Sequence, residues 1–348
     1  MDTLIIGFGK RAKYSILPAL KIINEGKLYV FSNNLNKLET QKKKYDFELF
    51  NSIENESYEK ISKIFICTPY EKYLPIVQRL SKLNLTWVNL FIDTPIIPKI
   101  SNIHIKQYKN KFKEIFVTED CFYNPINNII QEVIKINKLG EIKKIDFNNF
   151  GHTYHALAQS RRLLKDKSIY FGIKNNDNFK FILSNSVINI NGKQLETGHI
   201  HIFFKENIIS INDDNINNNA KYKISYLFTE DLFSGYLVNN QTVSLDDNLK
   251  KIFLKLRQIC TIHNIRNKFL QEKIISLVCL MTEINNQNKK KYFLDDGIYD
   301  SFLIAITRKI NFFFDIRFKK KSLFIYIFYK FYNFKKIFSK YQINLFFK

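Results

Sequence analysis

The chain begins with an apolar run at positions 4–6, followed by two glycines and then by apolar residues with helical spacing over positions 16–23. A short continuous apolar run predicts a strand buried on both faces, and the spacing after it predicts a helix. Gly7, Gly9 and Ala12 lie in the turn between them and match the pattern G-x-G-x-x-G/A. In this context the pattern predicts a turn that holds the pyrophosphate of a dinucleotide at the start of a helix.

Apolar runs at 27–32, 61–68 and 86–92 alternate with helical patterns as far as about residue 120. Alternation of this kind predicts an α/β fold with a doubly wound parallel sheet. Ligands of such sheets bind outside the carboxyl ends of the strands. Thr68 and Pro69 end the run at 61–68, and Asp93, Thr94 and Pro95 follow the run at 86–92. We therefore expect these five residues beside the cofactor.

The pattern changes after residue 115, where strands with Asn- and Gly-rich turns replace the strand–helix alternation. Strands are predicted at 141–150, 179–190, 199–204, 208–211 and 222–228, and helices at 127–136, 152–164, 249–259, 269–284 and 294–306. This mixture predicts an α+β domain. We therefore expect a dinucleotide-binding Rossmann domain over residues 1–120, a second domain over 121–315 and a C-terminal tail over 316–348.

Composition narrows the class of protein only a little. The 348 residues are long enough for two domains, and the net charge of +22 comes mostly from lysine, since only eight of the 54 basic residues are arginine. Arginine forks dominate nucleic-acid recognition, so we expect no nucleic-acid partner. The four cysteines lack C-x-x-C spacing, and neither a signal peptide nor a membrane-length apolar run is recognisable. These features predict free thiols in a cytoplasmic protein.

The second strand ends at Ser32 and Asn33, where a dinucleotide-binding domain often has the carboxylate that binds the adenosine ribose of NAD. Without that carboxylate a 2′-phosphate is not repelled, and Lys37 or Arg11 could pair with it. Alternatively, Ser32 and Asn33 simply begin a loop. The expected cofactor is therefore NADP or NAD, and the pattern slightly favours NADP.

Four stretches together resemble the Gfo/Idh/MocA oxidoreductases over roughly residues 3–310. They are IIGFGKRA followed by ILPAL, then ICTPYEKYLPI in the manner of a TP-x-x-x-H turn, then FIDTPI where the family has an E-K-P tripeptide, and finally residues 121–145 with NP, a helix and LGEIKKI. The resemblance implies a Rossmann domain joined to a large open mixed sheet, assembled face to face into homo-oligomers. It also implies oxidation or reduction of a sugar, inositol or related polyol with NAD or NADP.

The resemblance also assigns expected roles to residues. The expected cofactor-binding residues are Gly7, Phe8, Gly9, Lys10, Arg11, Ala12, Ser32, Asn33, Thr68, Pro69, Asp93 and Pro95. The reaction end departs from the family. Thr94 stands where the family has the lysine of E-K-P, and Tyr73 stands where it has the histidine of the TP turn. Gly151 stands where the family has the aspartate of Asp-x-x-x-His. His155 keeps the histidine place, so His155, Thr94 and Tyr73 are the expected catalytic positions.

An imidazole suits the removal of a hydroxyl proton near neutral pH, which makes His155 the expected acid–base group. The alternative is a hydrogen-bonded histidine at the start of a helix. Arg161 and Arg162 either clamp an anionic group of the substrate or form the solvated face of a helix. His199 and His201 alternate on a strand and could both face one metal ion, but no nearby carboxylate or cysteine pattern supports one, so we expect no metal.

Tyr292, Asp295, Asp296 and Asp300 are expected to cap and pack a segment before a late helix. Nine basic residues and an aromatic stripe follow in 317–348, a pattern that suits either peripheral contact with an anionic membrane or packing on the protein itself.

Two functions remain from the sequence. The first is an NAD(P)-dependent oxidoreductase acting on a sugar or nucleotide sugar, with a role in surface-polysaccharide biosynthesis suggested by analogy. The second is a dinucleotide-binding, catalytically degenerate protein that serves as a sensor or assembly subunit. A polyanion-binding protein, inferred from net charge alone, is the weakest interpretation.

Overall fold

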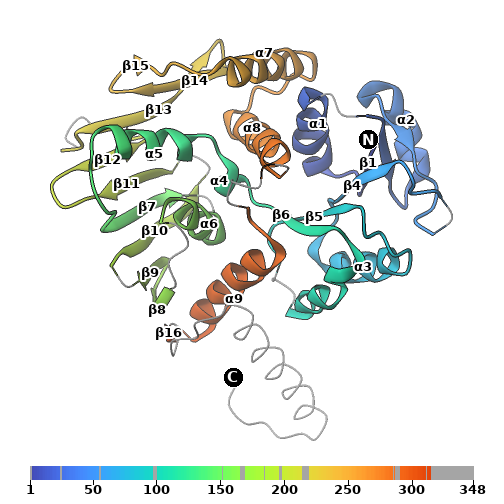
Figure 1. Cartoon of the computed structure of the whole chain (residues 1–348), viewed down its shortest axis with the longest axis horizontal. Helices are drawn as coiled ribbons and strands as arrows, with labels where there is room; N and C mark the ends of the chain where they lie inside the picture. Colours follow the sequence, from blue (N-terminus) through green and yellow to red (C-terminus); the bar gives the residue numbers. More distant parts are fainter. Residues whose placement is uncertain are drawn as a thin grey trace, which may run out of the picture.

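The computed structural model describes residues 2–314 apart from 24–25, 55, 97–99, 151, 165–168, 184, 196–197, 214–218, 285, 287–290 and 311. Two sheets organise this part of the chain, and they lie on opposite sides of the molecule in Figure 1. The first sheet is built by the blue and cyan segments, and the second by the green and yellow segments. The tail for which we predict membrane contact lies outside the described residues.

The first sheet has six described strands in the order β3-β2-β1-β4-β5-β6, and every pairing is parallel. The strands are β1 (Asp2–Ile6), β2 (Leu28–Phe31), β3 (Glu48–Leu49), β4 (Ile61–Ile66), β5 (Asn89–Asp93) and β6 (Glu114–Thr118). The connecting helices are η1 (Ala12–Ile16), α1 (Leu17–Ile23), α2 (Leu35–Tyr45), η2 (Tyr70–Lys72), α3 (Tyr73–Ser81) and η3 (Ile100–Lys111). This strand order, with reversal between β1 and β4, is that of a Rossmann domain.

A row of stacked phenylalanines holds the centre of this sheet. Phe65, Phe91 and Phe116 are in register on β4, β5 and β6, and their ring centroids are 4.4 Å and 5.3 Å apart. All three rings are almost fully buried. Each buries a large apolar surface and gains offset-stacking energy, so the row fixes the relative position of the strands whose carboxyl ends form the site.

The second sheet is mixed and has ten described strands in the order β15-β14-β13-β12-β11-β7-β10-β9-β8-β16. These are β7 (Lys144–Phe150), β8 (Ile169–Asn175), β9 (Asn178–Leu183), β10 (Val187–Leu195), β11 (His199–Phe203), β12 (Ile208–Ile211), β13 (Tyr222–Thr229), β14 (Leu232–Val238), β15 (Gln241–Thr242) and β16 (Phe312–Phe314). Side chains alternate across the sheet, so Ile200 and Ile202 of β11 are buried while His199 and His201 are half-buried on the other face.

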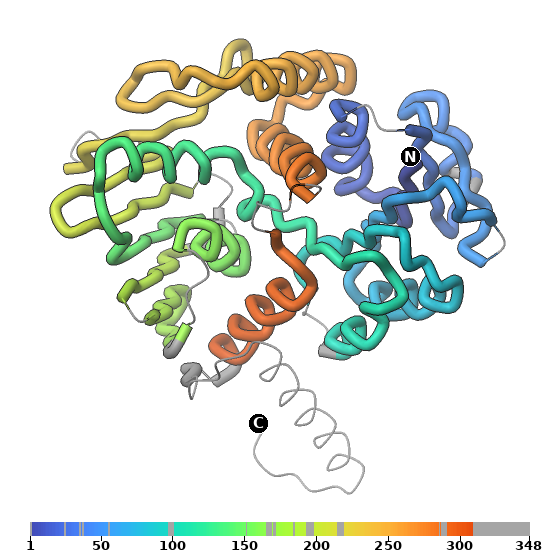
Figure 2. The backbone as a smooth tube through the Cα atoms, in the orientation of Figure 1, coloured from blue at the N-terminus to red at the C-terminus, as the bar shows by residue number. Residues whose placement is uncertain are grey.

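Six helices within the described residues accompany the second sheet or join the two sheets: α4 (Asp120–Tyr123), α5 (Ile126–Ile136), α6 (Thr153–Leu163), α7 (Asp247–Ile262), α8 (Lys268–Glu283) and α9 (Leu294–Ile310). Helix α8 packs against both α1 and α4, and α9 runs from β6 to β8. In Figure 2 these two orange helices lie between the blue and green halves of the molecule. The last part of the described chain therefore fastens the second sheet to the first.

The predicted fold class is confirmed: a Rossmann-type parallel sheet is followed by a large mixed sheet. Some predicted elements were wrong in detail. The single strand predicted over 179–190 is a hairpin, because Leu183 and Ser186 form a turn in which the Leu183 amide donates to the Ser186 carbonyl at 2.9 Å. Strands β8 and β14 and helix α2 were not predicted. The domain boundaries remain a prediction.

Candidate cofactor and reaction site

The two glycines of the turn have different structural roles. Gly7 has φ of 98°, and a Cβ placed there would lie 2.7 Å from the carbonyl oxygen of Cys67 on the neighbouring strand end. Gly9 differs, because a Cβ there would meet nothing within 4 Å. Gly7 is thus required by the fold, whereas Gly9 leaves room above the turn. Ala12 is fully buried where the helix meets the sheet.

The helix that follows the turn begins as a π-helix, Ala12–Ile16, before it continues as α1. The Leu17 amide donates to the Ala12 carbonyl five residues earlier. Pro18, which comes next, has no amide hydrogen to continue an ordinary α-helical ladder at this point. Single π-turns of this kind occur often at functional sites.

A cleft of about 590 Å³ opens above the turn at the carboxyl ends of β1, β2 and β4. Seven of the predicted cofactor residues line it: Gly7, Phe8, Gly9, Ser32, Asn33, Thr68 and Pro69. Lys72 and Arg79 of the α3 region also line it and were not predicted. Arg79 forms an ion pair with Glu54 at 2.5 Å. The cleft has the position and size of a dinucleotide site at the point where the strand order reverses.

Arg11 lies elsewhere, at the reaction end of the sheet. Its guanidinium donates to both carboxylate oxygens of Asp120, at 2.7 and 2.9 Å, and to Asp93 at 3.1 Å. Asp93 also accepts from the Thr118 hydroxyl at 2.8 Å. Burial disfavours the charge of Arg11, but Asp120 and Asp93 outweigh it and raise its pKa. The suggestion that Arg11 could pair with a 2′-phosphate was therefore wrong, and the side chain of Lys37 lies outside the description.

Tyr73, Thr94 and Tyr154 lie together beside this ion network. Tyr73 is 3% exposed, and burial, followed by the charge of Asp93, raises its pKa well above its usual range. Burial likewise raises the pKa of Tyr154, and a hydrogen bond with Thr94 opposes that shift. Neither tyrosine is prepared to lose a proton near neutral pH, and threonine has no suitable pKa of its own.

His155 is held by a carboxylate that the sequence did not reveal. Its Nδ1 lies 2.5 Å from Oε1 of Glu119, which also accepts from the Cys121 amide at 3.2 Å. His155 is 5% exposed and Glu119 1% exposed. Burial raises the pKa of Glu119, although His155 opposes the shift. The other carboxylate oxygen, Oε2, is buried and has no hydrogen-bond partner among the described residues.

Such a carboxylate–histidine pair fixes the orientation of the ring and directs its second nitrogen, Nε2, toward proton exchange. The pair replaces the expected Asp-x-x-x-His arrangement, whose aspartate position is occupied by Gly151. Glu119 directly follows β6, and a position at the carboxyl end of a parallel strand was the one available signal for it.

Arg161 and Arg162 are neither a substrate clamp nor a solvated face. They are 5% and 6% exposed, and both form ion pairs inside the protein. Arg161 donates to Asp300 at 2.6 Å, and Arg162 donates to Glu283 at 3.1 Å. Asp295, Asp296 and Asp300 lie within α9 and not before it, so their predicted place ahead of the late helix was also wrong. These pairs join α6 to α8 and α9.

A second cavity, of about 300 Å³, lies next to Tyr154 and Pro95. His152, Ser301 and Arg308 complete its polar lining. Arg308 donates to the Thr153 hydroxyl at 3.2 Å. Pro95 directly follows Thr94, so this cavity adjoins the reaction end of the site, and its volume matches that of a small polar ligand.

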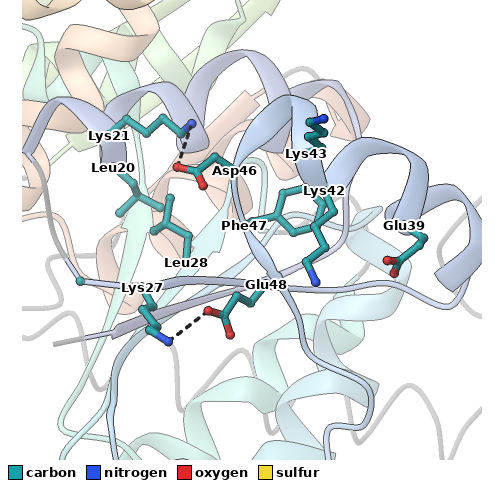
Figure 3. Close-up of a pocket in the computed structure, with 11 residues that line it drawn as sticks. Leu20, Lys21, Lys27, Leu28, Glu39, Lys42, Lys43, Asp46, Phe47 and Glu48 are labelled. Atoms are coloured by element: carbon teal, nitrogen blue, oxygen red, sulfur yellow. Dashed lines mark hydrogen bonds and ion pairs between the residues drawn. The ribbon is translucent and has the colours of Figure 1, made fainter.

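A larger cleft of about 780 Å³ lies at the opposite edge of the first sheet, where β2 and β3 begin (Figure 3). Figure 3 shows Lys21 directed at Asp46 and Lys27 at Glu48, with separations of 3.7 and 3.1 Å. These lysines form ion pairs on the surface, and the cleft lies away from the glycine turn and the His155 pair. We therefore assign it no part in the site.

Neither a family model nor a curated protein sequence matches the chain. Solved structures with the same fold do match. A myo-inositol dehydrogenase from Corynebacterium glutamicum aligns with 91% of this chain and 99% of its own, at 12% identity and a TM-score of 0.60. A scyllo-inositol dehydrogenase from Lactobacillus casei, with bound NAD(H) and scyllo-inositol, aligns with 90% of this chain and 98% of its own, at 14% identity and a TM-score of 0.57.

A super-repressor mutant of Gal80p from Saccharomyces cerevisiae aligns equally well, over 90% of this chain and 97% of its own, with 12% identity and a TM-score of 0.61. At these identities the similarity concerns the fold alone. The chain thus has the two-domain fold of Gfo/Idh/MocA-type dehydrogenases, as the sequence predicted. Because that fold also includes a repressor, function must be argued from the site.

Proposed function

We propose that the protein is an NAD(P)-dependent oxidoreductase that acts on a secondary alcohol of a sugar or nucleotide sugar. The buried His155–Glu119 pair is the observation that carries the proposal. Glu119 directly follows β6 at the carboxyl edge of the Rossmann sheet, and its neighbour Asp120 pairs with Arg11 of the segment after the glycine turn, which supports a proton acceptor at this edge. Buried pairs of this kind are costly to maintain, which favours a role in chemistry over one in stability.

In this proposal the cleft above Gly9 holds the dinucleotide, which supplies the hydride acceptor when bound. Seven of the expected cofactor residues line that cleft, and Gly9 leaves space for the pyrophosphate to approach the backbone. The residues fit either cofactor. Ser32 and Asn33 carry no charge that repels a 2′-phosphate, and Lys72 and Arg79 line the same cleft.

The protein supplies the acid–base part of the reaction. As the substrate carbon loses its hydride, the hydroxyl proton passes to Nε2 of His155. Glu119 accepts the hydrogen bond from Nδ1 and stabilises the charged ring that results. Thr94 and Tyr154 position the substrate by hydrogen bonding, since neither has the pKa for proton transfer. The cavity beside Pro95, with its hydroxyl, imidazole and guanidinium groups, is proposed to hold the sugar.

Single-turnover hydride transfer, followed with a panel of sugars and nucleotide sugars, tests this function. The proposal expects His155→Ala to slow transfer by on the order of a hundredfold. Transfer at an unchanged rate in that variant would contradict the assigned role.

A second candidate function is a dinucleotide-dependent sensor or assembly subunit. Two observations favour it: the lysine position of the family is Thr94, and the fold is shared with a super-repressor mutant of Gal80p. Tight dinucleotide binding without turnover of any tested sugar would favour this candidate over the enzyme.

The finer points of location and assembly are also proposals. We expect a cytoplasmic homo-oligomer, with residues 317–348 touching anionic membranes. No helix in the described part of the chain combines the length and apolarity needed to cross a bilayer. Liposome sedimentation of the full chain and of a chain ending at residue 316 tests the tail. Salt-sensitive sedimentation of the full chain alone supports contact, and equal behaviour of the two forms contradicts it.

A further inference from the structure

Two histidines share one face of the second sheet, away from the cofactor cleft. His199 and His201 are alternate residues of β11, so both imidazoles project from the same side, and their ring centroids are 5.1 Å apart. In Figure 1, β11 and β12 lie in the half of the molecule opposite β1 and α2.

A carboxylate reaches the same place from the neighbouring strand. Strand β12 pairs antiparallel with β11 and ends at Ile211. Asn212 then adopts a left-handed conformation with φ of 54°, and its amide donates to Ile224 at 3.0 Å. The turn brings Oδ2 of Asp213 to 2.8 Å from Nε2 of His201, twelve residues earlier in the chain. The Asp213 side chain is 5% exposed and that of His201 16% exposed.

The three side chains converge more closely than one hydrogen bond requires. A single ligand atom from each of His199, His201 and Asp213 lies within 4.8 Å of the other two. The hydrogen bond joins His201 to Asp213, and strand alternation places the ring of His199 beside them, so three possible metal ligands share one face. Two imidazoles and one carboxylate form a donor set that zinc accepts, with a fourth position left for water.

The charged neighbours are compatible with a cation. Asp146 of β7 lies opposite His201 in the sheet register, and its carboxylate neutralises Lys144 at 2.7 Å. Asn189 also donates to Asp146 at 2.7 Å. Lys144 lies over the ring of Phe203, whose edge packs against His201. The charge of Lys144 is therefore compensated by Asp146, and the ring of Phe203 packs on the imidazole of His201.

We propose that His199, His201 and Asp213 bind one divalent transition-metal ion, with zinc as the expected metal. The ion cross-links β11 to the segment that follows β12. The sequence favoured no metal because no carboxylate stood near the two histidines, and Asp213 is that carboxylate. A separate group, Glu119, Cys121 and His155, also has ligand atoms within 4.8 Å, but it belongs to the reaction site and is the main alternative location in the test.

The experiment titrates ZnCl₂ into the full-length, chelator-treated protein by calorimetry and repeats the titration with three variants. The inference expects one zinc ion per chain. His199→Ala, His201→Ala and Asp213→Asn should each weaken binding by at least the roughly 10- to 100-fold that loss of even a supporting contact costs. Asp213→Asn nearly preserves shape and hydrogen bonding, and circular dichroism checks that each variant folds. His263→Ala removes an imidazole elsewhere and should leave the affinity unchanged.

Cobalt substitution gives a second readout that is independent of affinity. A site made of nitrogen and oxygen donors should show ligand-field absorption without a thiolate-to-cobalt charge-transfer band. Absence of zinc binding, binding that none of the three variants weakens, or binding that shows the thiolate band and is lost in Cys121→Ser would overturn the inference.

Discussion

The two ends of the crevice at the edge of the first sheet are built in different ways. The cofactor end is an open cleft, and the turn at its base is formed by consecutive residues around Gly7 and Gly9. The reaction end is largely buried and charged, and residues far apart in sequence form it. Arg11 meets Asp120 across 109 residues, and Glu119 meets His155 across 36. The first end follows the pattern expected from the sequence, whereas at the second Thr94 and Gly151 stand where the resemblance implies a lysine and an aspartate.

The contrast has a physical reason. A pyrophosphate needs backbone N–H groups and space, which only a particular turn supplies. A proton acceptor needs only a suitable pKa within reach of the substrate, and several residue types on several elements can provide it. More residue types can therefore serve at the reaction end than at the glycine turn.

The largest expected effect separates the two glycines at the cofactor end. Gly9→Val should abolish dinucleotide binding and leave the thermal midpoint nearly unchanged, because its Cβ meets open space. Gly7→Val should unfold or severely destabilise the protein, because its backbone conformation and the Cys67 carbonyl exclude a side chain. Calorimetric binding and thermal unfolding of both variants provide the check. Equal thermal midpoints for the two would contradict this distinction.

The next effect concerns the ion network at the reaction end. Arg11→Met leaves Asp93 and Asp120 close together without a cation and should lower the free energy of unfolding by about 3 kcal/mol. Arg79→Met is the matched control, because its pair with Glu54 is exposed to solvent and should contribute much less to stability. Urea unfolding measures both losses, and losses of similar size would show that the network is not buried in solution.

Within the reaction end, we expect three substitutions to reduce the rate of hydride transfer by different amounts. His155→Ala should reduce turnover by on the order of a hundredfold, equivalent to about 2.7 kcal/mol. Glu119→Gln should cost less, because the ring stays in place but loses the carboxylate that stabilises its charge. Thr94→Ala should cost least. Rates of hydride transfer across the three variants test the ranking, and a larger loss for Thr94→Ala than for His155→Ala would reverse the assignment.

The smallest effect is a pH dependence of stability at the helix that joins the two sheets. Burial raises the pKa of Glu272 on α8 to about 8, although a hydrogen bond with Tyr226 opposes the shift. Between its ordinary value of 4.5 and about 8, the unfolded carboxyl ionises while the folded one keeps its proton. Stability should therefore fall as pH rises through this window.

The slope cannot exceed roughly 1.4 kcal/mol per pH unit, and partial exposure of Glu272 reduces it further. Glu272→Gln should flatten the dependence measured by urea unfolding at pH 5, 6, 7 and 8. Glu132→Gln, at an exposed position, is the control and should leave the dependence as it is. Stability that rises with pH and does not respond to Glu272→Gln would contradict the shift.

Sequence revealed features that depend on local pattern. Continuous apolar runs predicted β1, β4 and β5, and the fold class was confirmed. Periodicity also predicted α5 over 127–136, close to its observed span Ile126–Ile136. The cofactor turn was also predictable, because its geometry is encoded in consecutive residues. Whether its residues bind a dinucleotide stays a prediction.

Contacts between distant segments were not predictable. Arg161 and Arg162 look like a solvated stripe because their partners, Asp300 and Glu283, lie more than a hundred residues away. Glu119 and Asp213 lie only 36 and 12 residues from their histidine partners, but on separate segments, and they were missed as well. Each carboxylate follows a strand, and only the strand order and register determine which histidine it meets. A single sequence carries no direct signal for register.

The most direct test of the central claim is calorimetric titration of the unmodified, full-length protein with NADP and with NAD. We predict that at least one of the two dinucleotides binds with a stoichiometry of one per chain. We also predict that the same titration of Gly9→Val gives no heat of binding while that variant remains folded. Failure of both dinucleotides to bind the unmodified protein would contradict the account.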